Sequence, residues 1–139
     1  MQATLIQCTK SKRDEAAAAR DLYDDSDYYC KMRAYALARD QPWFILSAKH
    51  GLLRPRERVE PYDDFGLSED QCKEIAQSLA SMCVTEVELI AGSKYSNPLT
   101  PELERYGIEV IERCRGLKIG SRMARLSELI HEVKNEQLC

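Results

Sequence analysis

The chain has 139 residues, of which 44% are hydrophobic and 31% are charged, and its formal net charge is −3. A chain of this length typically forms one compact domain, so we expect a single α/β domain over residues 1–139. The longest uncharged apolar run, residues 43–46, is far shorter than the roughly 20 residues that a membrane helix needs, so we expect no membrane partner. Basic residues follow the first apolar run, which reverses the order of a secretory signal and indicates a cytoplasmic protein.

Six cysteines are spread along the chain without the C-x-x-C spacing of zinc sites and redox dithiols. Disulfide frameworks belong to small secreted chains, so we expect reduced thiols. The chain has only two histidines that could serve as imidazole ligands. We therefore expect neither a bound metal nor a cofactor.

The first half of the chain alternates between apolar runs and helical patterns. Residues 3–8 predict a strand, and the alanine-rich residues 14–22 predict a short helix. Ser26 is a favourable N-cap for a helix over residues 26–40. Pro42 ends that helix, because the residue before a proline leaves the helical region. A second strand is predicted at residues 43–46, and the irregular stretch at residues 51–67 is long enough to indicate a lid or an active-site loop.

In the second half of the chain, Ser68 and Gln71 form a capping box that begins a helix ending near residue 82. Two further strands are predicted at residues 85–91 and 108–111, and two further helices at residues 100–107 and 121–137. This alternation predicts a three-layer, Rossmann-like α/β fold. Helices would cover both faces of a mostly parallel sheet of about four strands.

Each predicted strand is followed by a cation, and three of the four are also followed by hydroxyl groups. The carboxyl ends of parallel strands meet at one edge of a sheet, where open α/β sheets bind ligands. Lysines, hydroxyls and backbone N–H groups gathered there predict a pocket for an anion such as phosphate. The alternative is that these segments are ordinary polar surface loops. The ligand-binding candidates at this edge and in the loop after residue 51 are Thr9, Lys10, Ser11, Lys12, Ser47, Ala48, Lys49, Gly51, Tyr62, Gly92, Lys94 and Tyr95.

Three side chains are candidates for catalysis. His50 and Asp63 lie on or beside loops that follow strands, where either could move a proton. Cys8 ends the first strand next to basic residues, which favour a reactive thiolate, although an inert core cysteine is the alternative. Tyr62 and Tyr95 offer flat rings on which a nucleobase could stack, or they pack in the core.

Several segments resemble a family of small proteins labelled YaaA-like, after the peroxide-stress proteins. The family pattern C-[ST]-x-x-K matches residues 8–12, L-Y-x-x-S matches residues 22–26, I-L-S-A-K-[YH]-G-L-L matches residues 45–53, and E-P-Y-D matches residues 60–63. Residues 91–95 and 116–120 are similar to the family's A-G-x-x-Y and G-x-x-I-G. The last of these motifs adds Gly120 to the ligand-binding candidates.

The first two segments are also similar to the P-C-S-x-x-K-P-Y-x-x-S signature of the archaeosine synthase core domain. That domain attaches an amine to a modified guanine base in tRNA and is related in fold to uracil-DNA glycosylases. The resemblance therefore implies a uracil-DNA-glycosylase-like form of the α/β fold. It also implies site residues at Cys8, Thr9, Lys12, Tyr23 and Ser26.

These observations favour an enzyme that acts on a nucleotide or a nucleobase, by base modification or N-glycosidic chemistry. The roles expected are a phosphate held by Lys12, Lys49 and Ser47, a proton moved by Asp63 or His50, and a base flanked by Tyr95. One alternative is a non-catalytic module that binds nucleotides or nucleic acid, whose affinity would fall with salt. Another is a thiol-based oxidant sensor that acts through Cys8.

Overall fold

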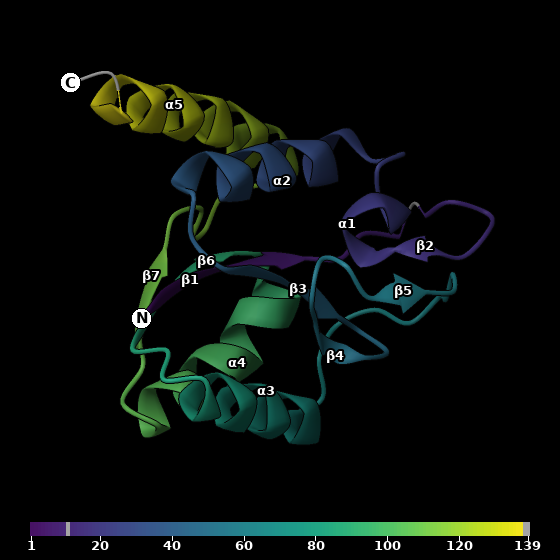
Figure 1. Cartoon of the computed structure of the whole chain (residues 1–139), viewed down its shortest axis with the longest axis vertical. Coiled ribbons are helices and arrows are strands. Elements are labelled where there is room, and N and C mark those ends of the chain that lie inside the picture. The colour runs from purple at the N-terminus through teal and green to yellow at the C-terminus, as the bar shows by residue number, and fades with distance from the viewer. Residues whose placement is uncertain (11, 138–139) are drawn as a thin grey trace.

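A computed structural model describes residues 1–10 and 12–137 of the chain (Figure 1). Within these residues, five strands form one sheet in the order β4-β3-β1-β6-β7, and β2 and β5 form a separate two-stranded sheet. Strands β3, β1, β6 and β7 are parallel to one another, whereas β4 is antiparallel to β3. The strands are β1 (Gln2–Gln7), β2 (Ala17–Ala18), β3 (Trp43–Ser47), β4 (Gly51–Leu53), β5 (Arg58–Val59), β6 (Glu86–Ile90) and β7 (Glu109–Glu112).

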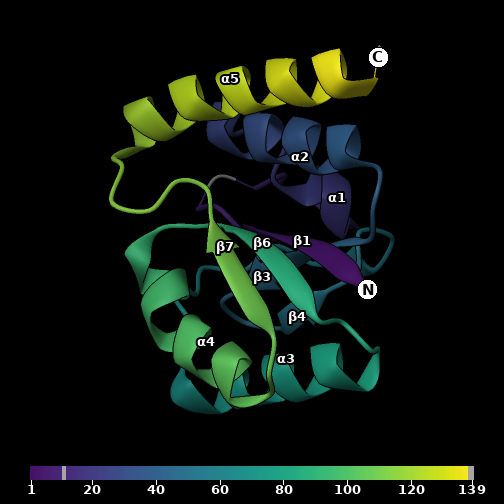
Figure 2. The same ribbon diagram turned by 90° about the vertical axis from the view of Figure 1, so that its left-hand side faces the viewer.

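Helices cover both faces of the five-stranded sheet. Figure 1 and Figure 2 show α2 and α5 on one face and α3 and α4 on the other. The two helices on each face are packed against each other. The helices are α1 (Ala19–Leu22), α2 (Asp27–Arg39), α3 (Glu69–Ser81), α4 (Ser93–Arg105) and α5 (Ile119–Gln137).

The central strand β1 explains why the core is apolar on both faces of the sheet. Ile6 is in register with Ile45 of β3 and with Ile90 of β6, and all three side chains are buried. Strands covered on both faces by helices read as continuous apolar runs rather than as alternating patterns. The apolar run at residues 43–46 follows this rule, whereas residues 3–8 and 85–91 also contain polar side chains, including Glu88 in β6.

The expected α/β class and the mostly parallel sheet are confirmed, but the sheet has five strands rather than about four. The additional strand, β4, lies in the stretch that was predicted to be irregular. Gly51 adopts a φ of 73°, which glycine tolerates and which lets the chain turn back along β3. Residues 14–22 also differ from the predicted helix: Ala17 and Ala18 pair with β5, and only the short α1 remains.

The expected helix starts are correct for α2 and α3 but not for α4. Ser26 caps α2 by accepting a hydrogen bond from Tyr29 N, and the capping box of Ser68 and Gln71 begins α3. Helix α4 begins seven residues before Thr100 and contains two prolines. Its buried side chains recur every four residues at Tyr95, Leu99 and Leu103, so packing against the core outweighs the cost of Pro98 and Pro101 in the helix.

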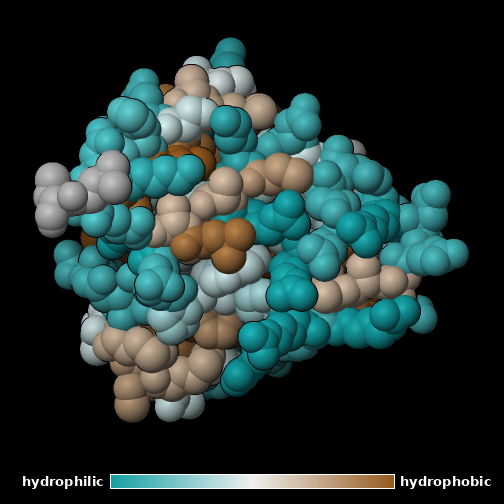
Figure 3. Space-filling view, turned by 45° about the horizontal axis from the view of Figure 1, so that its top comes forward, coloured by the Kyte–Doolittle hydropathy of each residue, from teal (hydrophilic) through white to brown (hydrophobic). Residues whose placement is uncertain are grey.

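The outer surface is more hydrophilic than this apolar core. Figure 3 shows hydrophilic side chains over most of the face that α5 helps to form, with smaller apolar areas between them. Within residues 1–10 and 12–137, no helix has the length and apolar character that crossing a membrane requires.

Glu88 is a charged residue in the middle of β6, and its side chain is almost completely buried, with 3% exposed. Its carboxylate accepts hydrogen bonds from Tyr35 Oη at 2.7 Å and from Arg113 at 2.9 Å, and Arg39 lies 3.3 Å away. Burial and the hydrogen bond to Glu88 raise the pKa of Tyr35 to about 12. These contacts connect β6 to α2 and to the segment after β7, because a buried charge must be paired.

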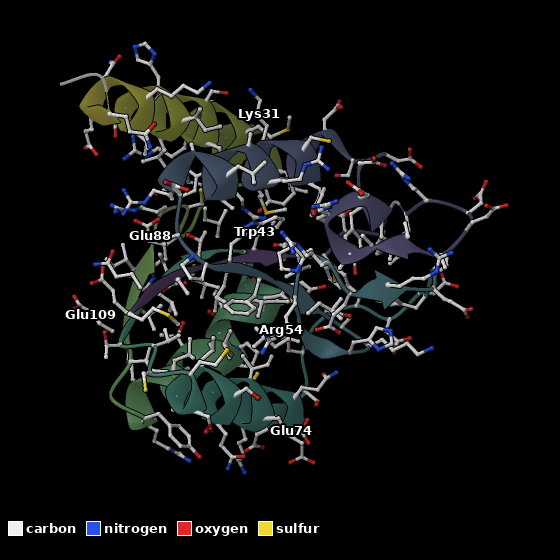
Figure 4. All side chains as sticks on the ribbon, in the orientation of Figure 1. Lys31, Trp43, Arg54, Glu74, Glu88 and Glu109 are labelled. Carbon is white, nitrogen blue, oxygen red and sulfur yellow. The ribbon has the colours of Figure 1, made fainter. Side chains whose placement is uncertain are left out.

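Replacing Glu88 by glutamine should lower the free energy of unfolding by about 2–3 kcal/mol. Removing one partner of a fully buried ion pair costs about 3–5 kcal/mol, and the value is smaller here because Arg39 and Arg113 are partly exposed. Urea denaturation measures this change. Glu109→Gln, at the exposed start of β7, is the matched control and should change stability by less than about 0.5 kcal/mol; Figure 4 labels both glutamates. Equal effects of the two substitutions would contradict the buried ion cluster.

Candidate functional site

The main candidate site is a cavity of about 470 Å³ beyond the carboxyl ends of β1 and β6. After β1 the chain continues into α2 on one face of the sheet, and after β6 it continues into α4 on the other (Figure 2). Neighbouring parallel strands whose helices leave to opposite faces form a crevice between their carboxyl ends, where α/β proteins bind ligands. Gln7 and Thr9 line the cavity from β1, and Gly92 lines it from β6.

Part of the lining of the cavity is polar and positively charged. Lys10 follows β1, Lys94 lies in the first turn of α4, and Arg122 comes from α5. Ser26, which caps α2, and Ser93 supply hydroxyl groups. No carboxylate is among the described residues that line the cavity, so its formal charge is positive. Such a lining can hold an anion through charge and hydrogen bonds.

Apolar side chains lie next to these cations in the same lining, and two of them are unusually exposed. Phe65 is 48% exposed and Ile119 is 55% exposed, and Tyr28 lies beside them. The Phe65 ring stands edge-on to the buried ring of Tyr95, with 5.6 Å between the ring centres. Lys10 Nζ lies 5.4 Å from the centre of the Phe65 ring. Cationic and aromatic side chains therefore adjoin each other in the lining, so the cavity can hold a ligand that combines an anion with a flat apolar group.

Arg122 is held against the start of α4. Its Nε donates to the carbonyl of Leu117 at 2.6 Å, and one terminal nitrogen lies 3.4 Å from Tyr28 Oη. A Cβ at Gly92 would lie only 3.1 Å from the guanidinium, so glycine is what allows this close approach. Arg122 also lines a second cavity of about 350 Å³, which shares Gly92 and Ser93 with the first and includes Arg115 and Lys118.

A buried network of hydroxyl groups lies beneath the cavity. Cys8 Sγ and Tyr95 Oη are 3.1 Å apart, and Tyr95 Oη accepts a hydrogen bond from Gly66 N. Tyr62 Oη accepts a hydrogen bond from Ser47 Oγ at 2.7 Å and lies 2.6 Å from Tyr23 Oη. Burial raises the pKa of Tyr23, Tyr62 and Tyr95 above its usual value, so the hydroxyls stay protonated. Through Tyr62 and Gly66, this network ties the loop before α3 to the sheet.

Lys12 lies over this network. Its Nζ is 4.4 Å from the centre of the Tyr62 ring and 5.8 Å from that of Tyr23. Burial lowers the pKa of Lys12, although electrostatic interactions with Cys8, Asp63 and Asp64 oppose the shift. The exposed Asp63 is thus close enough to Lys12 to interact with it electrostatically.

The candidate residues predicted from the sequence fall into three groups in the structure. Six line the main cavity, namely Thr9, Lys10, Ser26, Gly92, Lys94 and Tyr95. Six belong to the hydroxyl network or its Lys12 side, namely Cys8, Lys12, Tyr23, Ser47, Tyr62 and Asp63. The remaining described candidates, Ala48, Lys49, His50, Gly51 and Gly120, are not among the lining residues of the main cavity. Ser11 lies outside the described residues.

None of the three residues expected to hold a phosphate, Lys12, Lys49 and Ser47, lines the main cavity. Ser47 is completely buried, donates to Tyr62, and accepts hydrogen bonds from the backbone N–H groups of Lys49 and His50. It stabilises the turn after β3, because its oxygen satisfies two donors of that turn. His50 and Gly51 line a separate cavity of about 120 Å³ beside α3, and the His50 ring stands edge-on to Tyr62.

Six lining residues of the cavity were not among the candidates predicted from the sequence, namely Gln7, Tyr28, Phe65, Ser93, Ile119 and Arg122. Ile119 belongs to the G-x-x-I-G motif, which was a usable signal. Arg122 had no such signal, since its position depends on how α5 returns over the sheet. Within residues 1–10 and 12–137, no group of three histidine, cysteine or acidic side chains is arranged to hold a metal ion.

Replacing Tyr62 by phenylalanine should lower the free energy of unfolding by about 1–3 kcal/mol, because Ser47 and Tyr23 lose a buried hydrogen-bond partner. Chemical denaturation followed by circular dichroism measures the change. Tyr106→Phe is the control, since Tyr106 is exposed, and should change stability by less than about 0.5 kcal/mol. A Tyr62→Phe protein as stable as the wild type would contradict a structural role for the network.

The comparisons with known proteins identify a family but not an activity. No curated protein and no solved structure matches the chain. A family model described as a family of unknown function, DUF6884, matches residues 3–128. This match includes β1 to β7 and the start of α5, and with them every residue that lines the main cavity. The chain therefore belongs to the DUF6884 family.

Proposed function

We propose that this protein is an enzyme that handles nucleotides or nucleobases, and that it binds them in the 470 Å³ cavity. One observation carries the proposal: cationic side chains and exposed aromatic and aliphatic side chains line the same cavity, with no carboxylate among the described lining residues. A nucleotide has these two complementary parts, a flat base and an anionic phosphate. The volume lies within the range of about 300–1,000 Å³ that is usual for small-molecule sites.

The phosphate lies at the start of α4 in this proposal. Gly92 is the N-cap of that helix and has no side chain to fill the space before its first turn. A helix N-terminus favours an anion through its backbone N–H groups and its dipole. Lys94 and Arg122 add charge at the same place, and Arg122 can form two parallel hydrogen bonds to phosphate oxygens.

The base lies against Phe65, because Tyr28 is buried and Arg122 lies 5.7 Å from the centre of its ring. An aromatic side chain that is half exposed offers a face for stacking, which contributes about 1–3 kcal/mol per base in single-stranded nucleic acid complexes. The ring of Tyr95 is buried and packs edge-on against Phe65, so Tyr95 positions Phe65 and does not itself stack on the base.

The groups proposed to move a proton, Lys12 and Asp63, lie beside the cavity without lining it. Asp63 is the carboxylate that interacts with Lys12, and the lowered pKa of Lys12 makes proton exchange between the two easier. Asp63 is two residues before Phe65, and Lys12 is two residues after Lys10. Phe65 and Lys10 lie against each other at the cavity, so Asp63 and Lys12 are held near it. His50 has a weaker claim, as it lines a different cavity.

The proposal also includes a Rossmann-like fold and a distant relationship to two known families. The parallel order β3-β1-β6-β7 with its crevice between β1 and β6 supports a Rossmann-like sheet, as in doubly wound nucleotide-binding folds. The motifs at residues 8–12, 22–26 and 45–53 support a distant relationship to YaaA-like proteins and to the archaeosine synthase core domain, with its uracil-DNA-glycosylase-like fold.

Calorimetric titration with AMP, GMP, UMP, guanosine and inorganic phosphate tests the binding. A nucleoside monophosphate should bind more tightly than guanosine or phosphate alone, because only the nucleotide contacts both the cationic and the aromatic side chains. Arg122→Gln should weaken the binding of the best nucleotide at least tenfold, or about 1.4 kcal/mol. Arg125→Gln is the matched control, three residues further along α5 and outside the cavity. No binding at millimolar nucleotide, or equal losses in the two variants, would remove the proposal.

A second experiment separates an enzyme from a binding module. The protein is incubated with the nucleotide that binds best, and chromatography follows the appearance of free or modified base. Asp63→Asn should abolish product formation while leaving nucleotide affinity within about twofold, since Asp63 does not line the cavity. Asp70→Asn, at an exposed position in α3 outside the cavity, should retain activity and is the control. If no product forms with the wild type but affinity falls steeply with salt, the non-catalytic alternative replaces the enzyme.

A further inference from the structure

A groove lies at the other end of the sheet, where β3 begins. Two adjoining cavities of about 490 Å³ and 310 Å³ share Leu37, Pro42 and Trp43, so together they form one continuous depression. Because β3 and β1 are parallel, the start of β3 is at the opposite edge from the candidate nucleotide cavity. Trp43 and Arg54, both in this region, are labelled in Figure 4.

The floor of the groove is apolar. Leu37 is 59% exposed, although leucine is usually buried, and Pro42, Trp43, Phe44 and Pro55 continue the apolar lining. Trp43 and Phe44 are held in β3, and Leu37 is held in α2, so this surface is already formed before any partner binds. Preformed surfaces lose less conformational entropy on binding, and tryptophan and arginine are the residues that most often dominate protein interfaces.

The two ends of the groove carry opposite charges. Arg20, Arg54 and Arg56 line one end, and Asp40 lines the other. Arg20 lies 3.7 Å from Asp21, but Arg54 and Arg56 form no ion pair with a carboxylate in the part of the chain that the structure describes. The carboxylate of Glu57 accepts from the backbone N–H of Arg54. Two exposed guanidinium groups thus remain available beside an apolar floor.

We propose that this groove binds an acidic segment of a partner protein. Apolar side chains of the segment lie over Leu37 and Trp43, and its carboxylates pair with Arg54 and Arg56. The polarity of the groove orients the segment, because Asp40 repels carboxylates from the opposite end. Asp40 disfavours single-stranded nucleic acid as the occupant, because it repels a continuous phosphate backbone.

The fluorescence of Trp43 tests this proposal, because Trp43 is the only tryptophan in the chain. The probe is a short peptide in which a leucine and a phenylalanine precede a run of glutamates, and the comparison peptide has glutamines instead. The acidic peptide should shift the emission of Trp43 in a saturable manner, and the glutamine peptide should bind at least tenfold more weakly. Arg54→Gln and Arg56→Gln should each weaken binding several-fold, and Leu37→Ala should do the same without unfolding the protein.

Arg58→Gln is the control variant, since Arg58 is exposed in β5 and does not line the groove. Saturating nucleotide should leave peptide binding unchanged, so failure of this proposal is distinguishable from failure of the proposed function. An unchanged Trp43 emission, equal binding of the two peptides, or tighter binding of a thymidine oligonucleotide would overturn the proposal. So would a shift of Trp43 emission with protein concentration alone, because it would identify a second copy of the chain as the occupant.

Discussion

The opposite directions in which the chain leaves β1 and β6 are the constraint on which the candidate site depends. These two strands are paired in parallel at the centre of the sheet, and their helices α2 and α4 cover opposite faces. No helix can then close the space directly beyond the two carboxyl ends. The start of α4, the loop after β1 and the first turn of α5 all face that space. Residues far apart in the sequence, such as Lys10, Lys94 and Arg122, line one cavity for this reason.

Buried polar groups hold this arrangement in place at two positions. Glu88 connects the sheet to α2 through Tyr35 and Arg39. Tyr62 and Tyr95 connect the loop before α3 to the sheet, so that Phe65 is positioned beside the cavity. A buried polar group without a partner is costly, and satisfied networks of this kind therefore favour one arrangement of the chain over others. The buried rings of Tyr62 and Tyr95 attach the loop before α3 to the rest of the fold.

The two ends of the sheet have different chemistry. The carboxyl edge carries hydroxyl groups, lysines and Arg122 around a cavity that suits a small anionic ligand. The amino edge near Trp43 carries an exposed apolar floor with unpaired arginines. The β1 and β3 backbones separate these surfaces by the length of the sheet, so binding at one need not obstruct the other.

By itself, the sequence determined the α/β class, the helix starts at Ser26 and Ser68, and the grouping of Thr9, Lys10, Gly92 and Lys94 at one edge. These features follow from local rules: apolar runs form strands, hydroxyl side chains cap helices, and parallel strands end at the same edge. Only the tertiary structure decided that Ser47 is buried under Tyr62, that α4 begins at Ser93 despite two prolines, and that Arg122 reaches Gly92. Each of these depends on packing between segments distant in the chain, and neither periodicity nor capping patterns carry information about such contacts.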